Sequence, residues 1–290
     1  MSTYPENNLA WQVLDHASKN GYAVGAFNCY TLECILGAIR AAEEKKSPCM
    51  IQVFPWSMHF HGREFIEYVS KACHSASVPI AFCLDHCIQE SDVELALTMP
   101  FDCIMVDASS KDPEENIKYC KKIVDIARTR GITIEAEMGR IIGSEDGVPM
   151  VDMEQLFTEP DLANDFLKRT GCQYLAPSFG NIHGPYPEGG PEKYWQLDRL
   201  AEIRKAIPSN VQMVLHGMYP VLPDLLKKTI EAGTLKLNVN NSIRIPWQDF
   251  MAEKGSRLEM TAMAEQSVEI FKNGVGDFMD FLGSSGQSWK

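Results

Sequence analysis

The chain has 290 residues, of which 45% are hydrophobic, and its formal net charge at pH 7 is −12. That length and apolar content suit one large hydrophobic core, so we expect a single domain over residues 1–290. The negative charge argues against nucleic acid and against an anionic membrane surface as partners. No run approaches the roughly 18 apolar residues of a membrane span, and residues 1–9 are too polar for a signal peptide. The nine cysteines are scattered without a C-x-x-C pair, which predicts reduced thiols in a cytoplasmic protein.

Short apolar runs alternate with amphipathic segments along the chain, after an N-terminal helix predicted at Leu9–Lys19. The predicted strands are Ala23–Phe27, Cys49–Phe54, Ile80–Leu84, Cys103–Val106, Ile132–Glu137, Tyr174–Pro177, Gln212–Leu215 and Lys236–Val239. The predicted helices include Leu32–Lys45, Arg63–His74, Asn116–Arg130, Pro223–Ala232 and one that starts at Pro160, and Glu188–Pro191 is predicted as a loop. This alternation predicts an α/β fold, a closed (β/α)8 TIM barrel with the N-terminal helix on its floor. A doubly wound sheet would alternate in the same way, but it usually has a glycine-rich turn after its first strand, and Asn28-Cys29-Tyr30 has none.

Three of the seven histidines directly follow apolar runs, in Leu84-Asp85-His86, Asn181-Ile182-His183-Gly184 and Leu215-His216-Gly217. If those runs are parallel strands of one barrel, the three imidazoles emerge at the same end and face one another. Three neutral imidazoles in an open shell suit a catalytic zinc ion, which keeps a further position for water or substrate. The sequence therefore predicts one Zn²⁺ per chain on these three side chains.

Polar residues collect at the other predicted strand ends, where barrel enzymes place their chemistry. These residues are Asn28, Asp107, Glu137, Asn238 and Asn240. Asp85, beside His86, is predicted to face the substrate as a proton shuttle. The segment Ser144-Glu145-Asp146-Gly147 is an acidic loop flanked by glycine that could close over the barrel mouth, so Glu145 is a candidate mobile acid or base.

Some residues have competing interpretations. His59 and His61 form an H-x-H pattern, which is either an auxiliary metal pair or, as we favour, part of a substrate loop or of the surface. Cys83 and Cys87 flank the first strand-end histidine, but strand alternation favours buried thiols over metal ligands. Lys236 could form a Schiff base with a carbonyl substrate, although three histidine ligands make a lysine nucleophile unnecessary.

Seven motifs occur in a characteristic order: Gly21–Asn28, Leu84–His86, Ile134–Gly139, Ser144–Asp146, Gly180–Gly184, Val214–Gly217 and Leu237–Asn240. Together they resemble the class II, metal-dependent fructose-bisphosphate and tagatose-bisphosphate aldolases almost from end to end. The resemblance implies a (β/α)8 barrel that forms a homodimer or homotetramer, with Zn²⁺ on the three strand-end histidines. It also implies that Asp85 handles the hydroxyl proton beside the scissile bond and that Glu145 exchanges the proton on the enolate carbon. Glu137 would support the metal site as an auxiliary ligand.

Metal-dependent aldol chemistry suits this set of residues. When a carbon–carbon bond beside a ketone breaks, its electrons remain on an enediolate, and a Lewis acid that holds both oxygens stabilises that charge. We therefore expect an aldehyde-lyase that catalyses aldol or retro-aldol reactions.

The sequence departs from the family where a substrate phosphate is bound. After the seventh strand the family reads roughly His-Gly-Gly-Ser-Gly, whereas this chain has His216-Gly217-Met218-Tyr219-Pro220 and so loses backbone N–H groups that can approach an anion. Pro187 replaces a lysine, and Phe54 replaces a serine that is common at the end of the second strand. The segment Asn238-Val239-Asn240-Asn241-Ser242 keeps only part of the Asn-x-Asn/Asp-Thr-Asp motif. Because bulky and apolar residues replace charge-assisted donors, we expect a less phosphorylated and partly apolar substrate.

The substrate, a small ketol or sugar-derived molecule, is expected to contact residues of the same motifs. The candidates are Asn28, Asp107, Asn181, Gly184, Gly217, Met218, Tyr219, Asn238, Asn240, Asn241 and Arg244. Arg244 or Arg257 could still bind a phosphate, which keeps an ordinary fructose- or tagatose-bisphosphate aldolase open as the runner-up. The same residues are also compatible with a metal hydrolase that uses Asp85 or Glu145 as base, and with a protein that binds a ligand without catalysis.

Overall fold

The fold is a closed barrel of eight parallel strands, which confirms the predicted architecture. The computed structural model describes residues 3–143 and 156–290, with Ser256 described by its backbone alone. The strands, in their order around the barrel, are β1 (Val24–Asn28), β2 (Cys49–Val53), β3 (Ile80–Cys87), β4 (Cys103–Val106), β5 (Thr133–Met138), β6 (Tyr174–Pro177), β7 (Gln212–Leu215) and β8 (Thr234–Val239). The ring closes where β8 pairs with β1, with Lys236 opposite Val24 and Val239 opposite Phe27.

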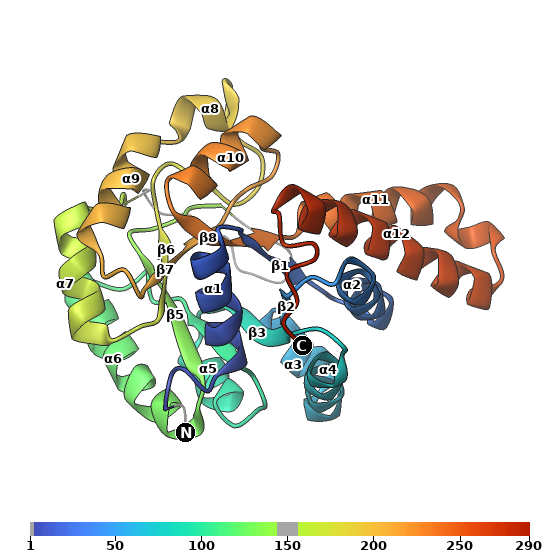
Figure 1. Ribbon diagram of the computed structural model, residues 1–290, viewed down its shortest axis with the longest axis horizontal. Helices are drawn as coiled ribbons and strands as arrows, with labels where there is room; N and C mark the ends of the chain where they lie inside the picture. The colour runs from blue at the N-terminus through green and yellow to red at the C-terminus, as the bar shows by residue number, and fades with distance from the viewer. Residues whose placement is uncertain (1–2, 144–155) are drawn as a thin grey trace.

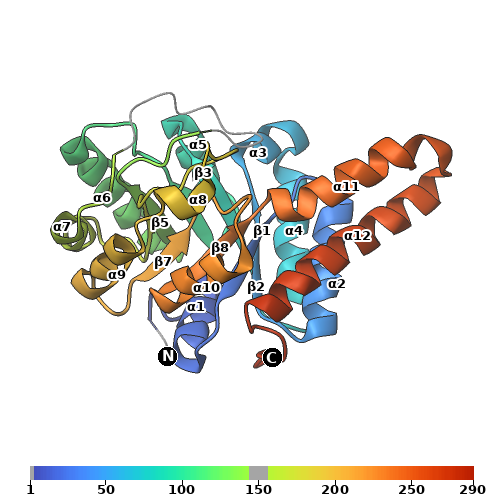
Figure 2. The same cartoon turned by 90° about the horizontal axis from the view of Figure 1, so that it is seen from above.

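Helices pack around the barrel, across one of its ends and beside it (Figure 1; Figure 2). They are α1 (Leu9–Asn20), α2 (Leu32–Lys45), α3 (Pro55–His61), α4 (Arg63–Ser75), α5 (Glu90–Ala96), α6 (Pro113–Arg130), α7 (Pro160–Thr170), α8 (Gly190–Tyr194), α9 (Leu197–Ala206), α10 (Pro223–Glu231), α11 (Asn241–Glu253) and α12 (Met260–Phe281). At the start of α1 the Asn8 side chain accepts a hydrogen bond from the Trp11 amide, and Gly21, with a φ of 72°, ends the helix. No helix within the described ranges is both long and apolar enough to cross a membrane.

Strand β3 differs from its predicted extent in a way that matters for the site. It continues through Cys87, so Asp85 and His86 belong to the strand instead of following it. The register with β4 shifts between Leu84 and Cys87, and His86 has a φ of 42°. In a regular strand two successive side chains point to opposite faces. The irregularity therefore allows both Asp85 and His86 to reach the same site.

The predictions were also wrong where proline and glycine start helices. Glu188–Pro191, predicted as a loop, contains the start of α8 at Gly190. The loop expected to carry His59 and His61 is the helix α3, and Pro55 lies in its first turn. Beyond Val239 no element was predicted from the sequence, whereas the structure has α11 and α12.

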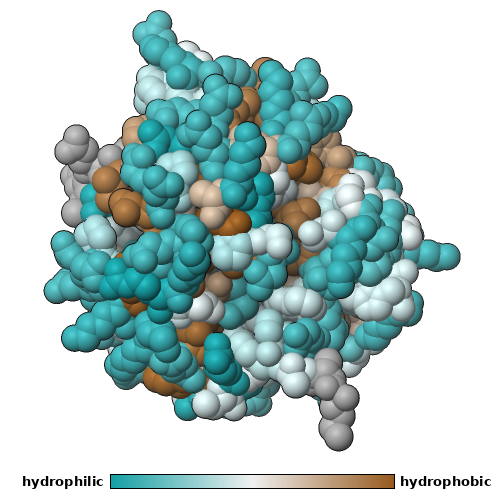
Figure 3. Space-filling model, turned by 60° about the vertical axis from the view of Figure 1, so that its left-hand side comes forward, coloured by the Kyte–Doolittle hydropathy of each residue, from teal (hydrophilic) through white to brown (hydrophobic). Residues whose placement is uncertain are grey.

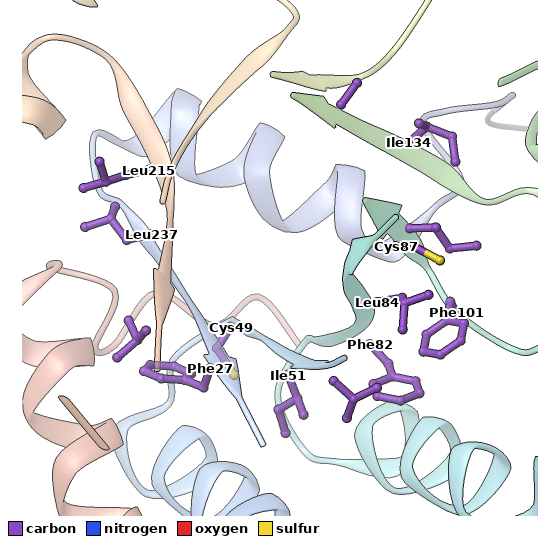
Figure 4. Packing of buried hydrophobic residues seen from close by; sticks show 14 of the residues in the cluster. Phe27, Cys49, Ile51, Phe82, Leu84, Cys87, Phe101, Ile134, Leu215 and Leu237 are labelled. Atoms are coloured by element: carbon purple, nitrogen blue, oxygen red, sulfur yellow. The ribbon is translucent and has the colours of Figure 1, made fainter. Parts of the chain in front are cut away.

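Apolar side chains fill both the inside of the barrel and the layer between strands and helices. Inside, Leu14 of α1 packs with Val24 and Met50, so α1 closes the end at which the strands begin, as predicted for the floor helix. Outside, Phe27 and Ile51 belong to the layer that packs against the surrounding helices (Figure 4). Met50 and Ile51 are neighbours in β2 and take opposite sides, as strand alternation requires.

The last two helices form a hairpin that projects from the barrel (Figure 1; Figure 2). Helix α12 packs along α2 at Gly37, where a Cβ would lie 2.7 Å from the Cβ of Phe271. Trp247 of α11 stacks on the same phenylalanine, with ring centroids 5.7 Å apart. The face of the molecule in Figure 3 is mostly hydrophilic with scattered hydrophobic patches, as expected for a chain with a net charge of −12.

Candidate active site

The three strand-end histidines come together at the barrel mouth. His86 lies in β3, His183 follows β6 and His216 follows β7, and all three are buried. The ring centroid of His86 lies 4.7 Å from that of His183 and 4.8 Å from that of His216. One nitrogen from each ring lies within 4.8 Å of the others, which makes the three residues a possible donor set for a metal ion.

Two carboxylates orient two of these rings. His86 Nδ1 lies 3.0 Å from Asp107 Oδ2, and His216 Nε2 lies 2.8 Å from Glu135 Oε1. Because an ionised carboxylate only accepts hydrogen bonds, each of these nitrogens carries a proton. The other nitrogens, His86 Nε2 and His216 Nδ1, then face each other at 2.9 Å. Two lone pairs repel at that distance, so the geometry favours a positive charge between them, from a proton or from a metal ion.

The electrostatics of His86 agree with this requirement. Burial disfavours a charge on His86, but the nearby carboxylates of Asp85 and Asp107 outweigh burial and raise its pKa to about 10. In contrast, burial and the charge of His86 hold the pKa of His183 well below its usual range, so His183 is neutral.

The neutral His183 provides the clearest test of whether the residues fit a metal ion. Its Nε2 is buried and has no hydrogen-bond partner among the described residues. A buried polar atom without a partner is costly, and an imidazole lone pair in this situation is a preferred metal ligand. Three imidazoles, two of them backed by carboxylates, fit a divalent ion that prefers nitrogen ligands, such as zinc.

The buried ion pair of Lys236 and Glu135 contacts His216, and this pairing was not predicted from the sequence. Lys236 Nζ donates to the second oxygen of Glu135 at 2.7 Å and to Asn238 Oδ1 at 2.9 Å. Burial opposes ionisation of both groups, but their mutual attraction dominates: it raises the pKa of Lys236 and lowers the pKa of Glu135 to about 2. Lys236 is therefore a charged partner of Glu135, which argues against a Schiff base on this lysine.

Asp85 lies beside the histidines in a network of amide side chains. Its Oδ2 accepts from Asn28 Nδ2 at 2.8 Å and from Gln52 Nε2 at 2.9 Å, and its Oδ1 accepts from Asn238 Nδ2 at 3.1 Å. Three donors fix the carboxylate in one orientation. Gln52 was missed in the sequence, where its signal is a lone polar residue inside the apolar run of β2.

Asp107 and Glu137 form a second possible donor set with His86. Glu137 Oε1 accepts from the Ile141 amide at 2.7 Å, and within the described residues its Oε2 has no partner. Burial and the adjacent Asp107 raise the pKa of Glu137 to about 8. Its position next to His86 is compatible with the auxiliary role implied by the resemblance.

Seven of the eleven predicted substrate-binding residues line a small cavity at the start of α11, whereas Asn28, Asp107, Asn181 and Arg244 do not. It is lined by Gly184, Gly217, Met218, Tyr219, Asn238, Asn240, Asn241 and Ser242. At its edge, Arg244 Nη2 donates to Asn241 Oδ1 at 2.6 Å. Asn181 contributes indirectly, because its Nδ2 donates to the carbonyl oxygen of His216 at 3.1 Å.

Other predicted residues lie away from this cavity or beyond the described chain. His59 pairs with Asp92 at 2.9 Å, and His61 Nε2 lies 3.1 Å from the Tyr30 carbonyl, so in the described part of the chain these histidines join no metal donor set. The ring of Phe54 faces His86, with centroids 6.4 Å apart. Glu145 lies outside the described residues.

Comparison with known proteins identifies the family of the chain. A family model described as "Fructose-bisphosphate aldolase class-II" matches residues 8–287. The chain is similar to a crystal structure of a protein from Coccidioides immitis, provisionally named a fructose-1,6-bisphosphate aldolase, with 38% identity, a TM-score of 0.92 and coverage of 97% and 98% of the two chains. It is 31% identical to a fructose-bisphosphate aldolase of Thermus caldophilus, over 96% of this chain and 98% of the relative. It is 34% identical to a sulfofructosephosphate aldolase of Alkalicoccus urumqiensis, over 83% of each. The chain therefore belongs to the class II fructose-bisphosphate aldolase family, whose members are metal-dependent aldehyde-lyases.

Proposed function

We propose that this protein is a zinc-dependent aldolase that cleaves or forms a carbon–carbon bond beside a ketol, with one ion on His86, His183 and His216. The observation that carries the proposal is the convergence of these buried imidazoles, with a carboxylate behind two rings and, on the third, a buried Nε2 that has no partner among the described residues. We infer a homodimer or homotetramer from the resemblance alone.

The chain's own groups divide the remaining work. A zinc ion bound there would supply Lewis-acid stabilisation of negative charge on the ketol oxygens. In the cleavage direction Asp85 would take the proton of the hydroxyl beside the scissile bond. Asn28 and Asn238, which each donate to one oxygen of the Asp85 carboxylate, would orient it for this transfer. Lys236 and Glu135 would keep His216 in the tautomer that presents Nδ1. Glu145 is proposed, from the family motif alone, to exchange the proton on the carbon.

We further propose a substrate that carries less phosphate than a sugar bisphosphate. Met218 and Tyr219 line the cavity at the point where the family has a glycine and a serine. Met218 is buried, and Pro220 has no amide proton to offer an anion. Phe54 adds an aromatic ring beside His86. These groups favour an apolar tail, whose burial contributes ~25 cal/mol per Å².

An ordinary sugar-bisphosphate aldolase is the second candidate. Two observations favour it: relatives of this chain are named fructose-bisphosphate aldolases, and the cavity keeps amide side chains at the first turn of α11. A helix N-terminus attracts anions, so Asn241 and Ser242 could contribute backbone N–H groups to a phosphate. No comparable observation favours a hydrolase.

Steady-state assays distinguish the two candidates. Fructose and tagatose 1,6-bisphosphates would be compared with unphosphorylated and singly phosphorylated ketols, with release of the aldehyde as the readout. We expect the bisphosphates to be poor substrates. A kcat/KM of ~10⁴ M⁻¹s⁻¹ or more on either bisphosphate, within the ordinary enzymatic range, would restore the sugar-bisphosphate candidate.

A further inference from the structure

His183 differs from the other two proposed ligands in how its ring is held. His86 is oriented by Asp107 and His216 by Glu135, each through a nitrogen of the ring. Within the described residues no carboxylate contacts the His183 ring, and its Nε2 has no partner. Apart from its edge contacts with the rings of His86 and His216, this ring is positioned by the backbone of its loop, whose His183 amide donates to the Ile142 carbonyl at 2.8 Å.

Tyr186 connects that loop to the loop of a second ligand. Its hydroxyl accepts from the Ile182 amide at 3.1 Å and donates to the Gly217 carbonyl at 2.6 Å. Ile182 immediately precedes His183, and Gly217 immediately follows His216. One phenol oxygen thus bridges the residues next to two proposed metal ligands that come from different strands.

The phenol itself is firmly fixed. Trp195 Nε1 donates to its oxygen at 2.8 Å, which uses the remaining hydrogen-bonding capacity of the hydroxyl. Burial raises the pKa of Tyr186 to about 12, so the hydroxyl keeps the proton that it donates to Gly217. The two loops also touch directly, because a Cβ on Gly217 would lie 2.2 Å from the Ile182 carbonyl oxygen. This close approach leaves no room for a side chain between the two loops.

We propose that Tyr186 is a positioning residue, whose hydroxyl sets the separation between His183 and His216 and thereby the affinity of the site for its metal ion. The inference rests on the proposed metal site. Loss of a group that orients a metal ligand typically weakens metal binding about 10–100-fold. Because Asn181 also joins the two loops, loss of the hydroxyl loosens this connection without removing it.

The test compares Tyr186→Phe with two matched variants. Tyr194→Phe removes a hydroxyl from an exposed contact with the Glu188 carbonyl, 3.4 Å away. Trp195→Phe removes the third hydrogen bond to the Tyr186 hydroxyl but leaves both loop contacts in place. The readouts are the Zn²⁺ dissociation constant from chelator competition, the visible spectrum of the Co²⁺-substituted protein, and the thermal midpoint.

We expect Tyr186→Phe to raise the Zn²⁺ dissociation constant about 10–100-fold and to alter the Co²⁺ spectrum, and excess Zn²⁺ should restore activity. Tyr194→Phe should match the unaltered protein, and Trp195→Phe should lower the thermal midpoint without weakening Zn²⁺ binding. Unchanged affinity in Tyr186→Phe would overturn the inference, as would equal losses of affinity in Tyr186→Phe and Trp195→Phe. If the unaltered protein binds no Zn²⁺, the proposed function fails and the inference fails with it.

Discussion

At the scale of single residues, Asp85 carries the proton-transfer proposal. Replacing it by Asn preserves its shape but removes the proton acceptor, while the three proposed histidine ligands stay in place. We expect Asp85→Asn to retain its metal ion and to lose roughly 10²–10⁴ in kcat, the usual contribution of a positioned acid–base group. Metal content and steady-state rates measure the two effects separately. A near-normal rate would show that the amide network around Asp85 has a structural role only.

The residues of the β7 loop make the substrate proposal testable by a gain of function. Combining Met218→Gly, Tyr219→Ser and Pro220→Gly restores small residues near the cavity and adds a backbone N–H donor at position 220. A hydrogen bond to a charged group contributes about 1.5–3 kcal/mol, so kcat/KM for fructose 1,6-bisphosphate should rise at least about tenfold. If the triple variant gains nothing on the bisphosphate while it keeps its metal ion, these three residues do not set phosphate preference.

Some site residues could be found in the sequence and others could not. His86, His183 and His216 were recognisable because each follows a run of apolar residues. The pairing of Glu135 with Lys236 joins residues 101 positions apart, and only closure of the barrel brings them together. Local pattern gives no information on such a contact, although a lysine inside an apolar strand is a signal that it has a buried partner.

At the scale of elements, the strands were predictable because buried parallel strands are short, nearly continuous apolar runs. The end of β3 was not, because its irregular register and the positive φ of His86 depend on the pairing with β4. Helices α3 and α8 were mistaken for loops, because they start at Pro55 and Gly190, and proline and glycine are also common turn residues.

The contact between His74 of α4 and Asp102, the residue before β4, predicts that the stability of the protein depends on pH. His74 Nε2 lies 2.9 Å from Asp102 Oδ2, and this hydrogen bond raises the pKa of His74 above its usual 6.5. Because the pKa of His74 is higher in the folded protein than in the unfolded chain, its protonation stabilises the fold at pH values below the unfolded-state pKa. This stabilisation disappears as the pH rises through the pKa of the folded state. Because 43% of the His74 side chain is exposed, solvent screening limits the effect to about 0.5 kcal/mol.

Denaturant titrations of His74→Gln and the unaltered protein at several pH values measure this contribution. At pH 5–6 the free energy of unfolding of His74→Gln should be lower than that of the unaltered protein by about 0.5 kcal/mol. At alkaline pH the two free energies of unfolding should converge. A stability difference that does not change with pH would show that the contact is not electrostatic.

At the scale of the whole molecule, the barrel explains why residues distant in the chain share one site. The carboxyl ends of parallel strands meet at one mouth, so β3, β6 and β7 deliver one histidine each. The projecting α11–α12 hairpin follows directly from β8 and places Asn240 and Asn241 at the same mouth. This much follows from the topology, whereas the substrate depends on a few side chains in the loops.

The central claim is that the histidine cluster holds a metal ion on which aldol chemistry depends. The most direct measurement is the metal content and aldol activity of the protein before and after exhaustive chelation, with His183→Ala in parallel. We predict one zinc ion per chain, loss of activity on chelation, recovery when Zn²⁺ is added back, and neither ion nor activity in His183→Ala. Full activity in chelated protein, or borohydride trapping of the substrate on a lysine, would contradict the account.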